Sequence, residues 1–272
     1  MTVYIIGAGL FGSVARDLLL ANGQKAFTID CQKTDSASKA AGCLIKPSWL
    51  SCLGSSYKDG MNTLDELYGL KQVPMQVFGK LKLDSIYHAP PDNILKGADI
   101  YGNVTEIDPD AGHLTLQDGR AYSGKILVAA GVWSKALLGD RFGPVKMEGQ
   151  RGVSFLYRTH FPEAKLRMWA PYKQSVAFEI NNGITWFGDG TSIIEDNWKI
   201  EYENRALDHA LALDPSLSID NYITRRSGLR PYVTGHSGYF KKVGNKCWVS
   251  TGGAKNGVVL AALQAKQFLE NL

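Results

Sequence analysis

The sequence predicts an α/β fold in which a Rossmann-like domain is joined to a smaller α+β domain built on an antiparallel sheet. Residues 2–30 read as a strand, a glycine-rich turn, a helix and a second strand, the order of a parallel βαβ unit. Farther along, residues 153–157, 175–180 and 183–187 are short β-rich runs, and 198–213 has the pattern of a helix. We expect the three runs to form the antiparallel sheet.

The composition is that of an ordinary globular protein. Of the 272 residues, 44% are hydrophobic and 21% are charged, with no long polar or low-complexity tract. No apolar run approaches the roughly 20 residues that a membrane helix needs, and the first ten residues lack the features of a signal peptide. The four cysteines show no metal-binding spacing. We therefore expect a cytoplasmic protein with reduced thiols, no metal site and no membrane association.

The glycine-rich turn has the spacing of a dinucleotide-binding fingerprint. Gly7 permits a tight turn, Gly9 lets the backbone approach a pyrophosphate, and Gly12 allows close helix packing. The positive end of the helix would face the phosphates. Asp30 ends the second strand, where an acid can accept hydrogen bonds from ribose hydroxyls. The same predicted cofactor site includes the flanking residues Leu10, Phe11 and Cys31.

The fingerprint alone does not separate FAD from NAD, so the choice depends on the segments that follow it. Residues 38–44, with the sequence SKAAGCL followed by Pro47, are similar to the S-x-x-A-G-G/M segment of the D-amino-acid oxidase and glycine oxidase family of flavoproteins. Residues 125–134 resemble the strand of that family that ends in A-x-G-x-W-S. Residues 227–231 and 247–258 resemble its G-L-R-P and W-x-x-T-G-H-x-x-N-G segments, in the same order and spacing.

This resemblance implies that the chain binds FAD. No cysteine lies near residues 228–234, where related sarcosine oxidases attach the flavin covalently, so noncovalent FAD is expected. Gly253 stands where the family usually has histidine, which changes the local surroundings of the flavin. Beyond the fingerprint, the predicted cofactor site consists of Ser38, Lys39, Ala41, Gly42, Val104, Ala130, Gly131, Trp133, Gly252, Gly253, Lys255, Asn256, Gly257 and Val258.

The resemblance also implies a discontinuous FAD-binding domain, made of residues 1–47, 96–150 and 225–272. Residues 48–95 and 151–224 would form the substrate domain. The first of these two segments is short compared with its counterpart in glycine oxidase relatives, where it contributes helices that cover the pocket. Less cover predicts a more open site.

Arg230 is the best candidate for substrate binding. In the resembling family the arginine of G-L-R-P grips the substrate carboxylate, and a guanidinium can do so with two parallel hydrogen bonds while it stays charged. The structural alternative is a strand arginine paired with an acid such as Asp189. By the same resemblance Cys43 lies near the substrate face of the flavin, although an isolated cysteine is more often a small buried hydrophobic residue. Further substrate contacts are expected at Met168, Trp169 and Tyr172.

Residues 252–258 precede an apolar helical run that continues to Leu269. Their backbone N–H groups, together with the positive end of that helix, could stabilise a reduced anionic flavin. Asn256 could also cap the helix. A simple turn before an amphipathic helix explains the same glycines, and the two interpretations are compatible.

Three functions stay open at this point. The first is FAD-dependent oxidation of the C–N bond of glycine, a D-amino acid or an N-substituted glycine to an imine, in which the cofactor carries the hard step. The second applies this chemistry, oxidative or with a net lyase outcome, to a glycyl or aminoalkyl group on a modified DNA or RNA base. Reduced cover and the eight Lys or Arg residues against one acid within 221–272 motivate it. The third is a catalytically inactive flavin-binding interaction protein. The electron acceptor and the oligomeric state are left open.

Overall fold

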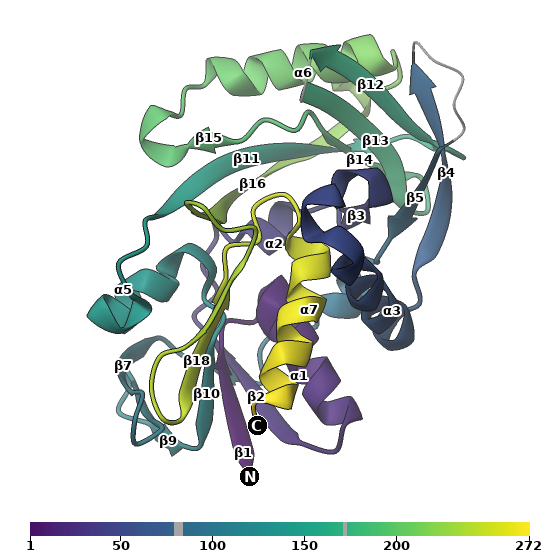
Figure 1. Ribbon diagram of the computed structural model, residues 1–272. Helices are drawn as coiled ribbons and strands as arrows, with labels where there is room; N and C mark the ends of the chain where they lie inside the picture. The colour runs from purple at the N-terminus through teal and green to yellow at the C-terminus, as the bar shows by residue number, and fades with distance from the viewer. Residues whose placement is uncertain (79–83, 171–172) are drawn as a thin grey trace.

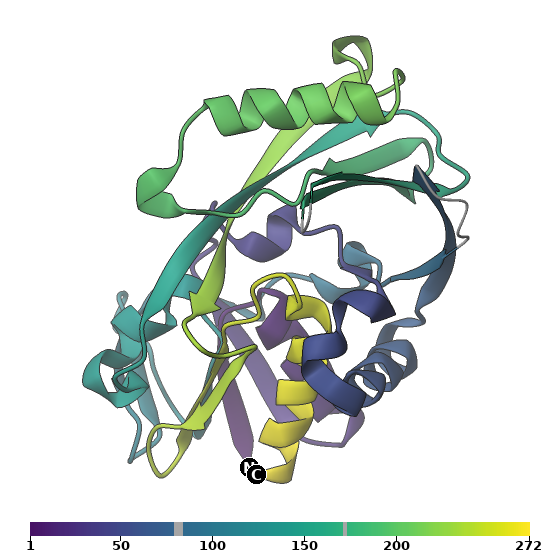
Figure 2. The same cartoon turned by 45° about the horizontal axis from the view of Figure 1, so that its top comes forward.

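The computed structural model describes residues 1–78, 84–170 and 173–272 (Figure 1). A lower part, here called the body, contains a mainly parallel sheet with its helices. An upper part, here called the cap, contains a large twisted sheet with the helix α6 (Glu201–Leu213) on its outer face (Figures 1 and 2). The N- and C-terminal ends of the chain lie close together at the bottom of the body (Figures 1 and 2).

The body contains the βαβ unit that the sequence predicts. Strands β1 (Thr2–Ile6) and β2 (Lys25–Asp30) pair in parallel and are connected by α1 (Leu10–Ala21). On its other side β1 pairs in parallel with β10 (Lys125–Val128), which pairs in turn with β18 (Cys247–Thr251). The side chains of these central strands are mostly buried, as expected for parallel strands covered on both faces. The full strand order is β17 (Tyr239–Lys242), β18, β10, β1, β2 and β6 (Ile100–Tyr101).

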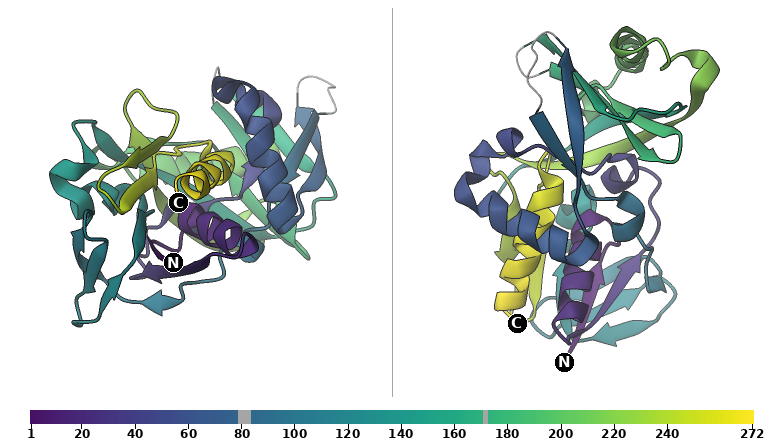
Figure 3. Two further views of the ribbon diagram at one scale, coloured as in Figure 1. Left: turned by 60° about the horizontal axis from the view of Figure 1, so that its bottom comes forward. Right: turned by 90° about the vertical axis from the view of Figure 1, so that its right-hand side faces the viewer.

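Helices cover one face of this sheet. α1 packs beside α7 (Gly257–Glu270), and α3 (Tyr57–Tyr68) lies against the outer side of α7 (Figure 3). The approach of α3 is close because Gly60 has no side chain, and a Cβ there would lie 2.7 Å from a methyl group of Val259. The opposite face is covered by α5 (Ser134–Leu138) and by a small antiparallel sheet of β7 (Val104–Asp108), β8 (His113–Leu116) and β9 (Ala121–Ser123).

The cap is a largely antiparallel sheet, as predicted. In the described residues its order is β15 (Ile193–Ile194), β11 (Met147–Arg158), β14 (Ile184–Gly188), β13 (Lys173–Asn181), β12 (Ala164–Ala170), β4 (Lys71–Phe78), β5 (Asp84–His88) and β3 (Leu44–Ile45). The contact between β12 and β4 is parallel. The predicted runs 153–157 and 175–180 fall within β11 and β13, the run 183–187 overlaps β14 from residue 184 on, and the predicted helix corresponds to α6. The predicted domain boundaries stay predictions.

One long strand links cap and body. β16 (Tyr222–Val233) pairs with β11 along most of its length and descends from the cap toward the body (Figure 2). At Gly228 a Cβ would lie 2.7 Å from the Cα of Ala37, so the absence of a side chain lets the body backbone approach the strand closely. The glycine of the G-L-R-P segment therefore has a packing role. The next residues of β16 carry Leu229 and Arg230 into the space between the two parts.

The remaining elements are short. They are α2 (Ala37–Ala40), α4 (Pro91–Ile94) and the 3-10 segments Pro47–Trp49, Ser51–Ser56, Gly131–Trp133, Gly139–Phe142, Glu195–Asn197 and Ile219–Asn221. Across the described ranges, every helix is too short or too polar to cross a lipid bilayer.

Candidate functional site

A cavity of about 1190 Å³ lies between the body and the cap. The body contributes the glycine turn, the end of β2, the loop before β6, the end of β10 and the start of α7. The cap contributes residues of β13, β14 and β16. Ligand pockets usually measure roughly 300–1,000 Å³. This cavity can therefore hold a large ligand together with a small second one.

The glycine turn leaves the start of α1 open to the cavity. Gly7 has φ +109°, and a Cβ there would lie 2.4 Å from the carbonyl oxygen of Ala129 at the end of β10. At Gly12 a Cβ would lie 1.8 Å from the oxygen of Gly7, so helix and strand pack without room for a side chain. The N–H of Leu10 donates to Ser38 Oγ at 2.8 Å. With no acidic side chain in its first turn, this helix end is suited to bind an anion such as a pyrophosphate.

Asp30 lies at the end of β2 on the cavity wall, as predicted. Its Oδ2 accepts a hydrogen bond from the N–H of Ala8 at 2.7 Å, and its Oδ1 accepts one from Gln32. Each carboxylate oxygen has a second lone pair available for a ribose hydroxyl. The adjacent Lys33 also lines the cavity, and its ammonium lies 5.8 Å from the centre of the Trp133 ring. Neither Gln32 nor Lys33 was predicted, because loop positions carry no periodic signal.

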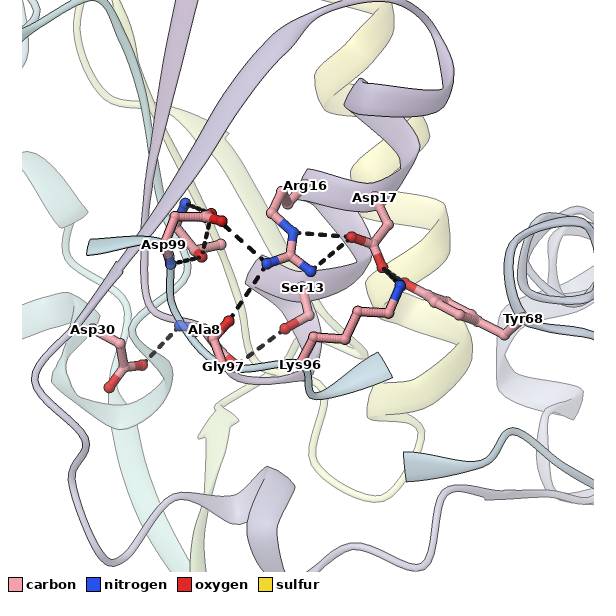
Figure 4. A network of polar contacts seen from close by, with 10 residues as sticks. Ala8, Ser13, Arg16, Asp17, Asp30, Tyr68, Lys96, Gly97 and Asp99 are labelled. Atoms are coloured by element: carbon pink, nitrogen blue, oxygen red, sulfur yellow. Dashed lines mark hydrogen bonds and ion pairs between the residues drawn. The ribbon is translucent and has the colours of Figure 1, made fainter. Parts of the chain in front are cut away.

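A polar network fixes the loop of residues 95–99, which lines the cavity through Leu95, Gly97 and Ala98 (Figure 4). Its centre is Arg16 on α1, which is only 6% exposed. Arg16 pairs with Asp17 at 2.9 Å, donates to the carbonyl of Gly97 at 3.4 Å and lies 3.7 Å from Asp99.

The outer members of the network connect the loop to two further elements, α3 and β2 (Figure 4). Asp17 accepts a hydrogen bond from Tyr68 of α3 at 3.1 Å and from Lys96 at 3.4 Å. Asp99 accepts from both the N–H and the hydroxyl of Thr28 on β2, at 2.7 and 2.8 Å. Burial and the charge of Asp17 raise the pKa of the Tyr68 hydroxyl, so it stays a neutral donor.

Residues 251–258 form a second wall of the cavity, next to Phe11 at the start of α1. The hydroxyl of Thr251 donates to the carbonyl of Gly131 at 3.1 Å and joins this wall to the end of β10. At Gly253 a Cβ would lie 2.6 Å from the Cα of Gly257 and 2.8 Å from the ring of Phe11. A side chain at position 253 would therefore meet both the backbone of Gly257 and the ring of Phe11, so glycine suits this position.

The predicted side-chain cap at Asn256 is wrong. Asn256 precedes α7, but its side chain makes no capping hydrogen bond. The amide group instead lies 3.2 Å from the sulfur of Cys52. The contact with the 51–56 segment therefore takes the place of the expected capping hydrogen bond. As a result, the first N–H groups of α7 have no side-chain cap at the cavity wall.

Arg230 reaches the cavity from β16. Its guanidinium lies over Gly152 of β11, where a Cβ would come within 2.4–2.6 Å of it. Nη1 donates to the carbonyl of Thr191 at 3.1 Å, and this is its only hydrogen bond to the described residues. No described acid forms an ion pair with it; Asp189 acts from farther away. Desolvation lowers the pKa of the guanidinium and Asp189 partly offsets this, but the group stays charged.

Lys255 brings a second positive charge to the same cavity. Desolvation lowers the pKa of its ammonium, and the positive charge of Arg230 lowers it further. Asp189 has the opposite, weaker effect on it. The cap end of the cavity therefore combines two cations with one buried carboxylate.

An aromatic wall is provided by Trp186 of β14, which the sequence interpretation missed. Its Nε1 donates to the carbonyl of Ala40 at 3.2 Å. Two glycines make room for the ring. A Cβ at Gly42 would lie 2.9 Å from it, and a Cβ at Gly188 would lie 2.4 Å from it. The available signal was strand alternation, because the neighbouring Phe187 is buried under α6 and Trp186 must point to the other face of the sheet.

Cys43 lines the cavity in an unusual backbone conformation, with φ +49°. Burial raises the pKa of its thiol to about 12. At neutral pH the thiol is protonated and poorly nucleophilic. Cys43 therefore contributes shape and an apolar surface.

The structure brings most of the predicted site residues to this cavity. Two predicted glycines, Gly12 and Gly252, support the turns from behind and do not line it. Met168 is 52% exposed and does not line it either. Tyr172 and the side chain of Trp169 lie outside the described residues. The predicted residues that line the cavity are Gly7, Gly9, Leu10, Phe11, Asp30, Cys31, Ser38, Lys39, Ala41, Gly42, Cys43, Val104, Ala130, Gly131, Trp133, Arg230, Gly253, Lys255, Asn256, Gly257 and Val258.

A glycine turn before a helix, an acid at the end of the second strand and a cavity large enough for a dinucleotide are the features of a nucleotide-cofactor fold. Residues 94–270 match the family model described as DAO, FAD dependent oxidoreductase. The chain belongs to this family and is an FAD-dependent oxidoreductase. No curated protein sequence gives a significant match.

Solved structures with similar folds include three flavoenzymes of low sequence identity. Glycine oxidase from Bacillus cereus is 17% identical with a TM-score of 0.74, covering 100% of this chain and 95% of that one. Iminodiacetate oxidase from Chelativorans sp. is 17% identical with a TM-score of 0.71, covering 97% and 93%. L-proline dehydrogenase from P. horikoshii is 12% identical with a TM-score of 0.73, covering 99% and 93%. These similarities confirm the predicted fold.

Proposed function

We propose that the protein oxidises the C–N bond of a small amino acid that carries one free carboxylate. The observation that carries the proposal is the guanidinium of Arg230, which lies at the cavity wall and makes a single hydrogen bond to the described residues. A guanidinium has five N–H donors in a planar fork, so a pair remains to hold a carboxylate. The named activities of the glycine oxidase and iminodiacetate oxidase folds support this choice.

The charges near Arg230 fit a substrate with a neutral amine. Arg230 and Lys255 contribute two positive charges and Asp189 one negative charge, which leaves a net charge of about +1. One carboxylate balances this charge only if the amine is unprotonated. An ammonium group would be repelled by both cations, so the site lowers the pKa of the bound amine.

The remaining residues position and shield the reacting group. FAD, when bound, supplies the electron-pair acceptor for the oxidation. Residues 7–12 and Asp30 would hold its dinucleotide portion, and residues 251–258 would lie along its ring system. Trp186 and Cys43 give the neighbouring surface an apolar character and limit the size of the substrate that fits beside it.

The test is anaerobic reduction of the bound flavin by a panel of amines. Glycine, sarcosine and other small amino acids should bleach the flavin absorbance, and simple amines without a carboxylate should not. Bleaching only by an amine carried on a nucleic-acid base would support that alternative substrate. A flavin that no amine reduces would contradict the proposal and favour an inactive binding protein.

Arg230→Ala is the matching variant. It should bind FAD normally, because the cofactor and the carboxylate use different segments. Its kcat/KM should fall about 10- to 100-fold or more, the loss expected when a charged hydrogen-bonding pair is removed. Unchanged turnover would refute the anchoring role.

A further inference from the structure

The turn Asp189-Gly190-Thr191, here called the 189–191 turn, contacts the anchoring arginine through the carbonyl of Thr191. It follows β14 directly. Gly190 has φ +69°, and a Cβ there would lie 3.0 Å from the carbonyl oxygen of Gln174 on β13. The turn is therefore tightly packed against the neighbouring strand.

Asp189 is the residue that holds this turn in shape. Its Oδ1 accepts from the N–H of Thr191 at 2.9 Å and its Oδ2 accepts from the hydroxyl of Thr191 at 2.7 Å. Its side chain is only 1% exposed. Nδ1 of His209 on α6 lies 3.5 Å from Oδ2. A buried carboxylate is costly unless such partners satisfy it, and here they hold it inside the turn.

The same turn bounds the guanidinium of Arg230 on two sides. The carbonyl of Thr191 takes the hydrogen bond from Nη1 at 3.1 Å. Asp189 supplies the nearest compensating charge. Because Gly152 has no side chain, the guanidinium occupies the space that a Cβ at this position would need. A long arginine side chain that loses these restraints gains rotamers, and its paired donors no longer face the cavity in one orientation.

We propose that Asp189 is a positioning residue that, through the Thr191 turn, fixes the Arg230 guanidinium in the orientation that receives the substrate carboxylate. This inference depends on the proposed function for the identity of the anion. Asp189 and Thr191 should therefore contribute to the affinity for the carboxylate and not to the affinity for FAD.

The test uses FAD-loaded protein and acetate as a carboxylate probe, titrated against the absorbance of the oxidised flavin. Asp189→Asn keeps the size of the side chain and removes its charge, and it should raise the acetate Kd about tenfold. Thr191→Val should act in the same direction, while Thr191→Ser keeps the hydroxyl and should restore wild-type affinity. Asp196→Asn, an exposed acid of the same region, is the matched control and should change nothing.

Measurements of FAD affinity and Tm separate positioning from a general structural role. Asp189→Asn should leave FAD affinity unchanged and, with any amine substrate found, raise KM more than it lowers kcat. The positioning role is overturned if Asp189→Asn binds acetate like the wild type while Arg230→Met does not. It is also overturned if FAD affinity falls in parallel with acetate affinity.

The proposed function is contradicted by a different result, namely a flavin that no amine reduces. The acetate titration decides the positioning role even then, because it needs no turnover. If acetate still binds to Arg230→Met, Arg230 does not anchor the carboxylate. That result would overturn both the proposed function and the positioning role of Asp189.

Discussion

At the scale of single residues, the four cysteines differ sharply in reactivity. Cys31 and Cys52 are exposed, whereas Cys43 and Cys247 are buried with thiol pKa values raised to about 12 by desolvation. Alkylation of the native protein should therefore modify only Cys31 and Cys52, as peptide mass mapping would show. Because Cys31 lines the cavity, FAD should protect it and leave Cys52 reactive. Rapid native labelling of Cys43 would contradict the buried position of this residue.

His88 makes stability depend on pH. The residue is 4% exposed, and its Nε2 has no hydrogen-bond partner among the described residues. Desolvation, followed by the charge of Lys71, lowers its pKa from 6.5 to about 4. Between these two pH values the unfolded chain binds more protons than the folded one. The contribution of His88 is therefore intact above pH 6.5 and is lost as the pH falls toward 4, by at most about 3 kcal/mol.

The measurement is denaturant unfolding of wild type and His88→Leu at pH 4.5 and pH 7.5. The free energy of unfolding of the wild type should drop more than that of the variant between the two values. Equal drops would show that the buried imidazole does not control acid stability. Leucine is a suitable replacement because His88 packs against the apolar ring of Phe178, with the two ring centroids 4.9 Å apart.

At the scale of elements, the loop 95–99 depends on Arg16 for its place on the cavity wall. Arg16→Met would leave Asp17 buried without its guanidinium partner and release the carbonyl of Gly97. Loss of one partner from a buried pair costs about 3 kcal/mol. We expect a lower Tm and an FAD affinity reduced on the order of tenfold, measured by flavin fluorescence. Arg141→Met, which removes an exposed pair with Asp110, should change neither.

The elements also show what sequence patterns can predict. The βαβ unit follows from the glycine spacing, because Gly7 and Gly12 each face backbone at less than 3 Å and no larger residue fits at either position. The aromatic wall cannot be predicted in this way, because Trp186 is positioned by Gly42 and Ala40, which lie some 140 residues earlier in the chain. Asn256 fits a local capping pattern, yet a contact with distant Cys52 prevails. The sequence therefore predicts the glycine turn and its neighbouring strands, whereas contacts made by distant segments, as at Trp186 and Asn256, are not visible in the local pattern.

At the scale of the whole molecule, FAD should act as a structural ligand. The cavity joins the body to the cap, so a bound cofactor contacts both parts and stabilises only the folded chain. Adding FAD at 100 times its Kd should raise the free energy of unfolding by about 2.7 kcal/mol. Scanning calorimetry of apo- and FAD-loaded protein would measure this. Because the flavin is expected to be noncovalent, acid or urea should release it completely, and flavin that stays with the denatured chain would contradict that expectation.

The central sheet has a consequence for how the protein matures in the cell. β1 and β18 are separated by β10 alone in space, but the glycine turn at residue 7 and the wall at residues 251–258 are about 245 residues apart in sequence. At ribosomal speeds of roughly 5–20 residues per second, these halves are synthesised about 10–50 s apart. β1 gains its second neighbour when β10 is made, but the edge of β10 stays unpaired until β18 follows some 120 residues later. The cofactor site is therefore complete only after nearly the whole chain has been synthesised.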